Sequence, residues 1–341
     1  MNRKHFLASS ASFMALSAFL PARGSSQVED TVPSIPPYLK AGDTIGITSP
    51  AGYITLDEIR PSIALMESWG YQVRVGSTIG KRDFTFGGTD EERADDLQHM
   101  LDDRSVKAIM CARGGYGSVR IVDRLKWNMF SKQPKWVIGF SDITVLHSHI
   151  NHNLGIATIH SKMCNSFPDD WAKADDPQKA TIDSIRKALS GEKMRYEFAS
   201  NPFNRAGSTM GALVGGNLKT LESLAGSSSN IVTKGKILFV EDTGEYLYSI
   251  DRMFWNLLRT GKLAQLAGLI IGGFKVKPSE DPAEEFGKNL QEIVLEKLKE
   301  TDYPVCFDFP VGHQRNNFAL KCGARHKLAV KADECSLMEI I

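Results

Sequence analysis

Residues 136–142 read Trp136-Val137-Ile138-Gly139-Phe140-Ser141-Asp142, and a helical pattern follows over residues 143–150. The apolar run 136–139 is typical of a buried β-strand, so Ser141 is expected where a strand ends and a helix begins. The free N–H groups of a helix N-terminus favour developing negative charge, which makes Ser141 a candidate nucleophile. The same spacing fits a Ser141 or Asp142 that only caps the helix. The G-x-S-x-G pattern is also incomplete, because Ile143 replaces its second glycine.

The strand-then-helix pattern recurs through the first half of the chain. Short β-rich runs occupy residues 44–48, 72–75, 108–112 and 136–139, and helical patterns occupy 56–69, 91–101 and 118–125. Strands that alternate with helices predict a parallel, doubly wound α/β sheet covered on both faces. Ligands of such sheets bind at the carboxyl ends of the strands, where the turns after residues 48, 112 and 139 meet.

One of these turns, Arg113-Gly114-Gly115-Tyr116-Gly117, is rich in glycine. Glycines allow close backbone approach and direct N–H groups into a site. A dinucleotide loop is disfavoured because Arg120 stands where the third glycine of its fingerprint belongs. An oxyanion hole formed by the Gly114/Gly115 turn and the Asp142 N–H fits better.

The second half predicts a smaller, β-rich mixed or barrel-like domain. Strands are expected at residues 236–240, 269–271, 304–307, 326–330 and 337–341, and helices at 249–258 and 285–299. Glu241 ends the first of these strands, where it can orient an imidazole or simply pair with Arg252. His313 lies in a loop after another strand, where a lone histidine is often a solvated surface residue.

Five segments are predicted along the 341 residues. They are an export signal at 1–24, a linker or lead-in at 25–42, the N-terminal α/β domain at 43–165, a crossover at 166–206 and the C-terminal domain at 207–341. Residues 1–24 have a basic start, a short apolar run and a polar exit, the layout of an export signal that is too short to span a bilayer. The expected location is the periplasm or cell envelope, or the cytoplasm if this signal is not functional.

Charge and metal-ligand patterns exclude several function classes. The 41 basic and 40 acidic residues leave a formal charge of +1, which gives no field toward nucleic acid or an anionic membrane. Five cysteines without a C-x-x-C pair argue against structural zinc and are expected to be mostly buried. Of His147, His149 and His152, only the last two share a helix face, so no metal and no cofactor are expected.

Taken together, the motifs resemble the LD-carboxypeptidase family of serine peptidases, whose relatives include the microcin-immunity peptidases. Seven stretches in order carry the resemblance: Thr48-Ser49-Pro50-Ala51-Gly52; Phe86-Gly87-Gly88-Thr89 with Arg93 and Asp96-Leu97; Arg113 to Gly117; Gly139 to Thr144; Gly211 to Leu218; Leu238 to Asp242 with Asp251-Arg252-Met253; and Pro310 to His313. The resemblance implies a nucleophile at Ser141, an acid at Glu241 and a base at His313, contributed by two domains. It further implies cleavage of the LD bond that releases D-Ala from a muropeptide tetrapeptide, and a homodimer.

The chain departs from the family pattern at two places. Ser161-Lys162-Met163 stands where Gly-Pro-Met is usual, and Lys321-Cys322-Gly323 stands where Pro-Leu-Gly is usual. These changes are expected to reshape the peptide groove and to leave the triad intact. Two alternatives stay open, namely a microcin-immunity-like peptidase acting on a peptidyl nucleotide and a non-catalytic peptidoglycan-binding module.

Overall fold

The computed structural model describes residues 33–340. The predicted export signal therefore lies outside the described residues, as does the first part of the predicted lead-in. The described part of the lead-in is packed against the fold: Ser34 pairs with Ile156, and the Leu39 N–H donates to the Leu189 carbonyl at 2.9 Å. Residues from Pro33 onward cluster into one compact unit. The domain boundaries within that unit stay a prediction.

The first sheet has the strand order β11-β5-β4-β3-β1-β2. Its strands are β1 (Thr44–Thr48), β2 (Gln72–Val75), β3 (Val106–Cys111), β4 (Trp136–Gly139), β5 (Thr158–His160) and β11 (Leu320–Cys322). The first five are parallel, which confirms the predicted parallel sheet, whereas β11 is antiparallel to β5. This N-terminal sheet thus receives one strand from near the end of the chain.

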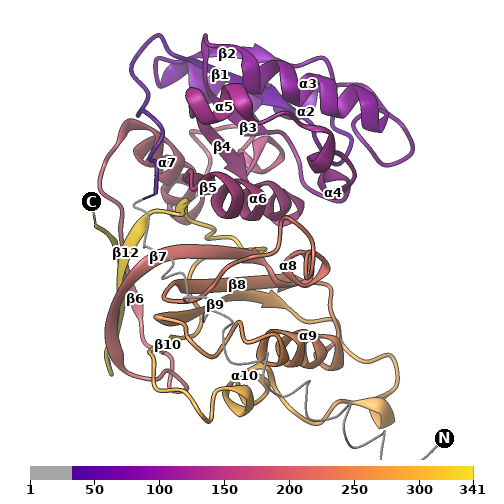
Figure 1. Cartoon of the computed structure of the whole chain (residues 1–341). Coiled ribbons are helices and arrows are strands. Elements are labelled where there is room, and N and C mark those ends of the chain that lie inside the picture. Colours follow the sequence, from indigo (N-terminus) through magenta and orange to yellow (C-terminus); the bar gives the residue numbers. More distant parts are fainter. Residues whose placement is uncertain (1–32, 341) are drawn as a thin grey trace, which may run out of the picture. The chain divides into compact units, whose positions relative to one another are not determined.

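Helices surround this sheet (Figure 1). They are α2 (Leu56–Ser68), α3 (Asp90–Asp102), α4 (Ser118–Ile121), α5 (Asn128–Lys132), α6 (Thr144–Leu154) and α7 (Asp176–Ser190). Capping boxes start α2 and α3, because Thr55 pairs with Glu58 and Thr89 with Glu92. The single helix expected over residues 118–125 is instead α4 followed by a 3-10 turn, Val122–Arg124.

The second sheet has the order β10-β9-β8-β7-β12-β13-β6. Its strands are β6 (Arg195–Ala199), β7 (Gly207–Asn217), β8 (Ile237–Thr243), β9 (Gly268–Lys275), β10 (Val305–Cys306), β12 (Arg325–Val330) and β13 (Glu334–Glu339), and its helices are α8 (Leu218–Ser223), α9 (Leu247–Arg259) and α10 (Leu290–Lys297). Strands β7 to β10 run parallel, and β12, β13 and β6 continue antiparallel. This mixed sheet agrees with the predicted β-rich mixed fold.

The long strand β7 was not predicted, because its glycine-rich sequence has low β-propensity. Packing explains the glycines. A Cβ on Gly215 would lie 1.9 Å from the Phe239 carbonyl oxygen, and one on Gly216 would lie 2.4 Å from Thr144 Oγ1. Strand β7 therefore approaches both β8 and helix α6 more closely than a side chain allows.

One hydrophobic core joins the two sheets. It includes Ile138 and Ile159 of the first sheet, Phe239 and Ile270 of the second, and Leu320 of the shared strand β11. All five cysteines are buried and free, which confirms their predicted burial. The two sheets are therefore packed into one compact unit.

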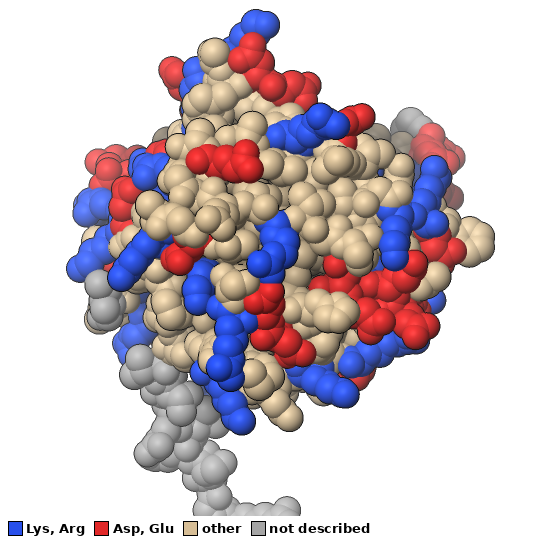
Figure 2. Space-filling model, turned by 90° about the horizontal axis from the view of Figure 1, so that it is seen from above, with Lys and Arg blue, Asp and Glu red and all other residues tan. Residues whose placement is uncertain are grey.

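The face of the molecule shown in Figure 2 has no dominant charge. Figure 2 shows basic and acidic side chains both spread over the face it presents, with uncharged area between them. Within residues 33–340, no helix combines the length and the apolar composition needed to cross a bilayer.

Candidate active site

Ser141 lies directly after β4, in the 3-10 turn Ser141–Ile143. Its φ angle is 61°, in the left-handed region that residues other than glycine rarely adopt. Such strain is common at functional sites, where the surrounding structure enforces it. Gly114 lies alongside: a Cβ there would be 3.1 Å from Ser141 Cβ and 3.4 Å from its Oγ. The glycine turn after β3 thus approaches the serine closely, as the sequence predicted.

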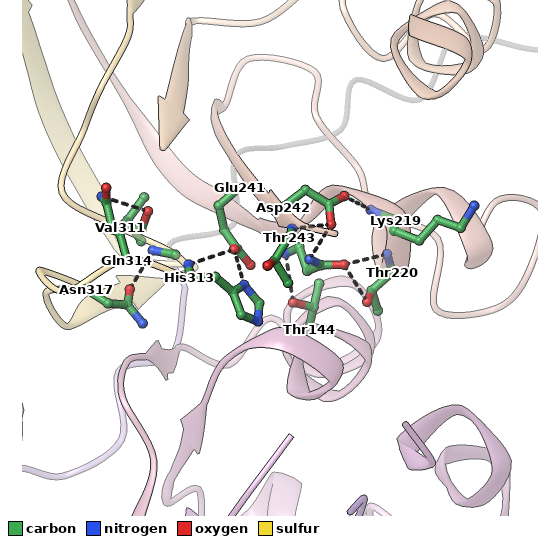
Figure 3. Close-up of polar contacts among 12 residues, drawn as sticks. Thr144, Lys219, Thr220, Glu241, Asp242, Thr243, Val311, His313, Gln314 and Asn317 are labelled. Atoms are coloured by element: carbon green, nitrogen blue, oxygen red, sulfur yellow. Dashed lines mark hydrogen bonds and ion pairs between the residues drawn. The ribbon is translucent and has the colours of Figure 1, made fainter. Parts of the chain in front are cut away.

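Glu241 and His313 form a hydrogen-bonded pair (Figure 3). Glu241 Oε2 lies 2.6 Å from His313 Nδ1 and accepts the His313 backbone N–H at 3.1 Å. The Glu241 side chain is fully buried, and that of His313 is 20% exposed. A carboxylate at Nδ1 requires a proton there and leaves Nε2 of the neutral ring as the base. Arg252 does not pair with Glu241 but lies over the Tyr248 ring.

The base loop and the serine turn meet through Phe140. Its ring centroid lies 4.9 Å from that of His313, and Phe140 directly precedes Ser141. Among the described residues no hydrogen bond joins Ser141 to His313. Hydrogen bonds of this kind are often long in ligand-free enzymes and tighten with substrate. The structure therefore pairs Glu241 with His313 and places the His313 ring against Phe140, the residue before Ser141.

One of the predicted oxyanion donors, the Asp142 N–H, belongs to the same turn. Asp142 lies in the first turn of a helix, where backbone N–H groups have no intrahelical acceptor. Its side chain points elsewhere, because Asp142 Oδ2 accepts the Ser118 N–H at 2.8 Å. Burial raises the pKa of this carboxyl. Neither Ser141 nor Asp142 caps α6, whose N-cap is Ile143.

The LD-carboxypeptidase N-terminal domain family matches residues 45–161, and the LD-carboxypeptidase C-terminal domain family matches residues 210–328. The probable murein peptide carboxypeptidase of Bacillus subtilis is 32% identical over 85% of this chain and 90% of that protein. The chain belongs to the LD-carboxypeptidase family.

A second relative and a solved structure are also similar to this chain. The murein tetrapeptide carboxypeptidase of Pseudomonas aeruginosa is 29% identical, over 82% of this chain and 91% of that protein. The crystal structure of muramoyltetrapeptide carboxypeptidase from Oxalobacter formigenes superimposes with a TM-score of 0.77 at 26% identity, covering 87% of this chain and 98% of that one.

In this LD-carboxypeptidase family member, a buried arginine orders the loops beside the serine. Arg93, fully buried, donates to the carbonyls of Pro50 at 2.5 Å, Gly117 at 3.0 Å and Gly88 at 3.2 Å. The arginine thereby ties together the turns after β1 and β3. The sequence marked Arg93 only as part of a motif, because nothing local indicates its burial.

Asn317 is a positioning residue that the sequence did not indicate. Its Oδ1 accepts the Gly312 N–H at 2.8 Å and lies 3.2 Å from His160 Nε2. Gly312 precedes His313 and has a φ of 105°, and a Cβ there would lie 2.5 Å from Glu241 Cβ. Asn317 therefore fixes the loop that presents His313 to Glu241.

The two halves of the chain also join through polar contacts. Thr144 Oγ1, at the start of α6, accepts the N–H of Asn217 at 3.0 Å, at the end of β7. Asn217 Nδ2 donates to Asp242 Oδ1 at 3.0 Å, and Asp242 follows Glu241. Figure 3 shows Thr144 and Asp242 to the right of the Glu241–His313 pair.

The histidines considered as metal ligands each have a different hydrogen-bond partner. His147 Nε2 lies 2.9 Å from the Gly139 carbonyl, and His149 Nδ1 lies 2.9 Å from Ser229 Oγ. Burial lowers the pKa of His147 to about 4, so this ring is neutral. In the part of the chain that the structure describes, no three His, Cys, Asp or Glu side chains are grouped to hold a metal ion.

Proposed function

We propose that the protein is a serine carboxypeptidase that cleaves the LD peptide bond before the terminal D-Ala of muropeptide tetrapeptides. The observation that carries the proposal is the buried Glu241 held at 2.6 Å from His313 Nδ1, beside a serine with a left-handed backbone. That arrangement is the acid and base of a nucleophilic triad. The murein peptide and tetrapeptide carboxypeptidases similar to this chain support the substrate class.

Acylation begins when His313 Nε2 removes the Ser141 hydroxyl proton. Ser141 Oγ forms a bond to the carbonyl carbon of the diamino acid's L-centre. Backbone N–H groups of Gly115 and Asp142 stabilise the oxyanion. The C–N bond then breaks, and the proton on Nε2 passes to the nitrogen of D-Ala, which leaves. Glu241 stabilises the imidazolium that exists between these two transfers.

Deacylation repeats the sequence with water. His313 Nε2 takes a proton from a water molecule, whose oxygen attacks the acyl ester carbon. The ester C–O bond breaks, and the proton returns to Ser141 Oγ. The products are a tripeptide and free D-Ala, and the enzyme is restored.

Mass spectrometry of defined tri-, tetra- and pentapeptide muropeptides tests the proposal. The wild-type chain is expected to convert tetrapeptide to tripeptide, and Ser141→Ala is expected to lose this conversion. Full D-Ala release by Ser141→Ala would refute the mechanism. A non-catalytic binding module would bind the muropeptide without turnover and would form no adduct with a fluorophosphonate probe. A peptidyl nucleotide assayed side by side tests the immunity-type alternative.

The proposal extends to export and to a homodimer. The basic start and short apolar run of residues 1–24 support export to the periplasm or cell envelope. Cell fractionation of the full chain, with and without residues 1–24, tests this location. Analytical ultracentrifugation tests the dimer, which rests on the family resemblance alone.

A further inference from the structure

Lys162 follows strand β5 of the first sheet, near the turn that contains Ser141. Strand β5 ends at His160 and pairs in parallel with β4, with His160 opposite Gly139. The segment after β5 and the segment containing Ser141 are therefore neighbours at the same sheet edge. Lys162 is also where this chain departs from the Gly-Pro-Met usual in the family it resembles.

The Lys162 ammonium contacts both components of the site. Its Nζ donates to the carbonyl of Gln314, the residue after His313, at 2.7 Å. It also lies 5.6 Å from the ring centroid of Phe140, the residue before Ser141. Lys162 thus lies where the base loop and the serine turn meet.

Among the described residues, the charge on Lys162 has no carboxylate partner. Within residues 33–340 no ion pair involves Lys162, whereas the buried Lys321 pairs with Glu339 at 2.9 Å and Lys297 with Asp251. Burial and then the nearby Lys275 lower the pKa of Lys162, and the charge of Glu241 opposes that shift. An ammonium has three donors, and the structure uses one of them for the Gln314 carbonyl.

Lys162 also lines a cavity of about 250 Å³. Its lining comprises Lys162, Ser166, Gln178, Thr181, Ile182 and Arg315. Arg315 forms an ion pair with Asp175, which leaves Lys162 as the unpaired cation of the lining. The cavity is next to the base loop, since Arg315 and His313 belong to the same short segment.

We infer that Lys162 Nζ binds the carboxylate of the substrate's terminal residue and that this cavity receives the leaving amino acid. The inference rests on the proposed function. A carboxypeptidase must accept a free carboxylate only a few bonds from the scissile nitrogen, and the buried Glu241 repels such a group. A positioned cation offsets that repulsion and selects chain ends over internal bonds.

The test compares two substrates that differ only in terminal charge. One is the tetrapeptide with a free D-Ala carboxylate, and the other ends in D-alaninamide. The wild type is expected to prefer the acid. In Lys162→Met the ratio of kcat/KM for acid over amide is expected to fall about 10- to 100-fold, mainly through KM. Lys162→Arg is expected to keep most of the preference, because it keeps the charge.

Lys262→Met is the matched control, because Lys262 is also half-buried and also donates to a carbonyl, that of Ile231, at 2.9 Å. It is expected to keep the wild-type ratio. An unchanged ratio in Lys162→Met, or an equal loss on both substrates, would overturn the inference and leave a structural role. Should Lys162→Met not fold, Lys162→Gln measures the same ratio.

Failure of the proposed function is distinguishable from failure of this inference. If the wild type cleaves neither substrate, the proposed function fails. Binding of the uncleaved tetrapeptide acid then decides the inference, measured by calorimetry in Ser141→Ala with and without Lys162→Met. About 10-fold weaker binding in the double variant supports the carboxylate site, and equal binding overturns it.

Discussion

Glu241 Oε2 accepts two hydrogen bonds from His313, one from ring Nδ1 at 2.6 Å and one from the backbone N–H at 3.1 Å. A single carboxylate oxygen thus fixes both the position of the loop and the tautomer of the ring. Strand β8 supplies the carboxylate, and the loop after β10 supplies the histidine. The buried Glu241 therefore positions His313 and is also its electrostatic partner.

Glu241→Gln should lower kcat by about 10⁴-fold with little change in KM, because an amide group facing Nδ1 favours the tautomer that cannot accept the serine proton. Steady-state D-Ala release measures both parameters. Glu67→Gln, an exposed carboxylate on α2, serves as the control. A loss below tenfold would show that Glu241 does not set the tautomer.

Gly312→Ala should reduce kcat/KM for D-Ala release more than Gly42→Ala, a substitution that causes backbone strain alone. Its φ is 105°, and the added Cβ would lie 2.5 Å from Glu241 Cβ, so the acid or the His313 loop must move. Gly42→Ala is the matched control, since its φ is 88° and nothing lies within 4 Å of its Cβ. Both variants should lose about 1 to 2 kcal/mol of unfolding free energy from strain. Equal kcat/KM in the two variants would contradict the prediction.

Thr144→Val should destabilise the junction of the two sheets. The substitution leaves the buried Asn217 N–H without its acceptor, which costs about 1 to 3 kcal/mol. Urea unfolding measures this loss, and D-Ala release should fall with it because the triad spans the junction. Thr85→Val, at an exposed side chain whose hydroxyl makes no hydrogen bond within residues 33–340, should change stability by less than about 0.5 kcal/mol. Equal stability of the two variants would refute the role of this contact.

Asp242 should make stability fall as pH rises from about 4 to about 6. Burial raises its pKa to about 6, so the folded chain retains a proton that the unfolded chain releases near pH 3.8. Unfolding in this window releases that proton, which favours the unfolded state increasingly with pH. From about pH 4 to about pH 6, the unfolding free energy of the wild type should therefore fall by about 2 to 3 kcal/mol relative to that of Asp242→Asn.

Urea unfolding at pH 4 and pH 7 checks this prediction. Asp57→Asn, at a carboxyl whose side chain is 85% exposed, is the control for removing one surface charge. Parallel pH profiles for wild type and Asp242→Asn would mean that Asp242 does not hold a proton in the folded chain.

Local patterns predicted four of the parallel strands of the first sheet, whereas the roles of Ser141, Glu241 and His313 came from the resemblance to the family. Apolar runs of strand length, followed by helical patterns, placed Ser141 at a strand-to-helix turn. Strand β7 was not predicted because its glycines lower the local β-propensity. These glycines are explained only by close contacts with Phe239 and Thr144, which lie elsewhere in the sequence.

The sequence by itself determined the parallel strands β1 to β4 and the glycine turn after β3, because these depend on periodicity and on short motifs, and its resemblance to the family implied the three catalytic candidates. Tertiary structure alone decided that Glu241 meets His313, that Arg93 ties two turns together and that Lys162 has no carboxylate partner among residues 33–340. Each of those facts depends on contacts between residues far apart in the chain. Burial and pairing of charge follow from such packing, and no local pattern encodes them.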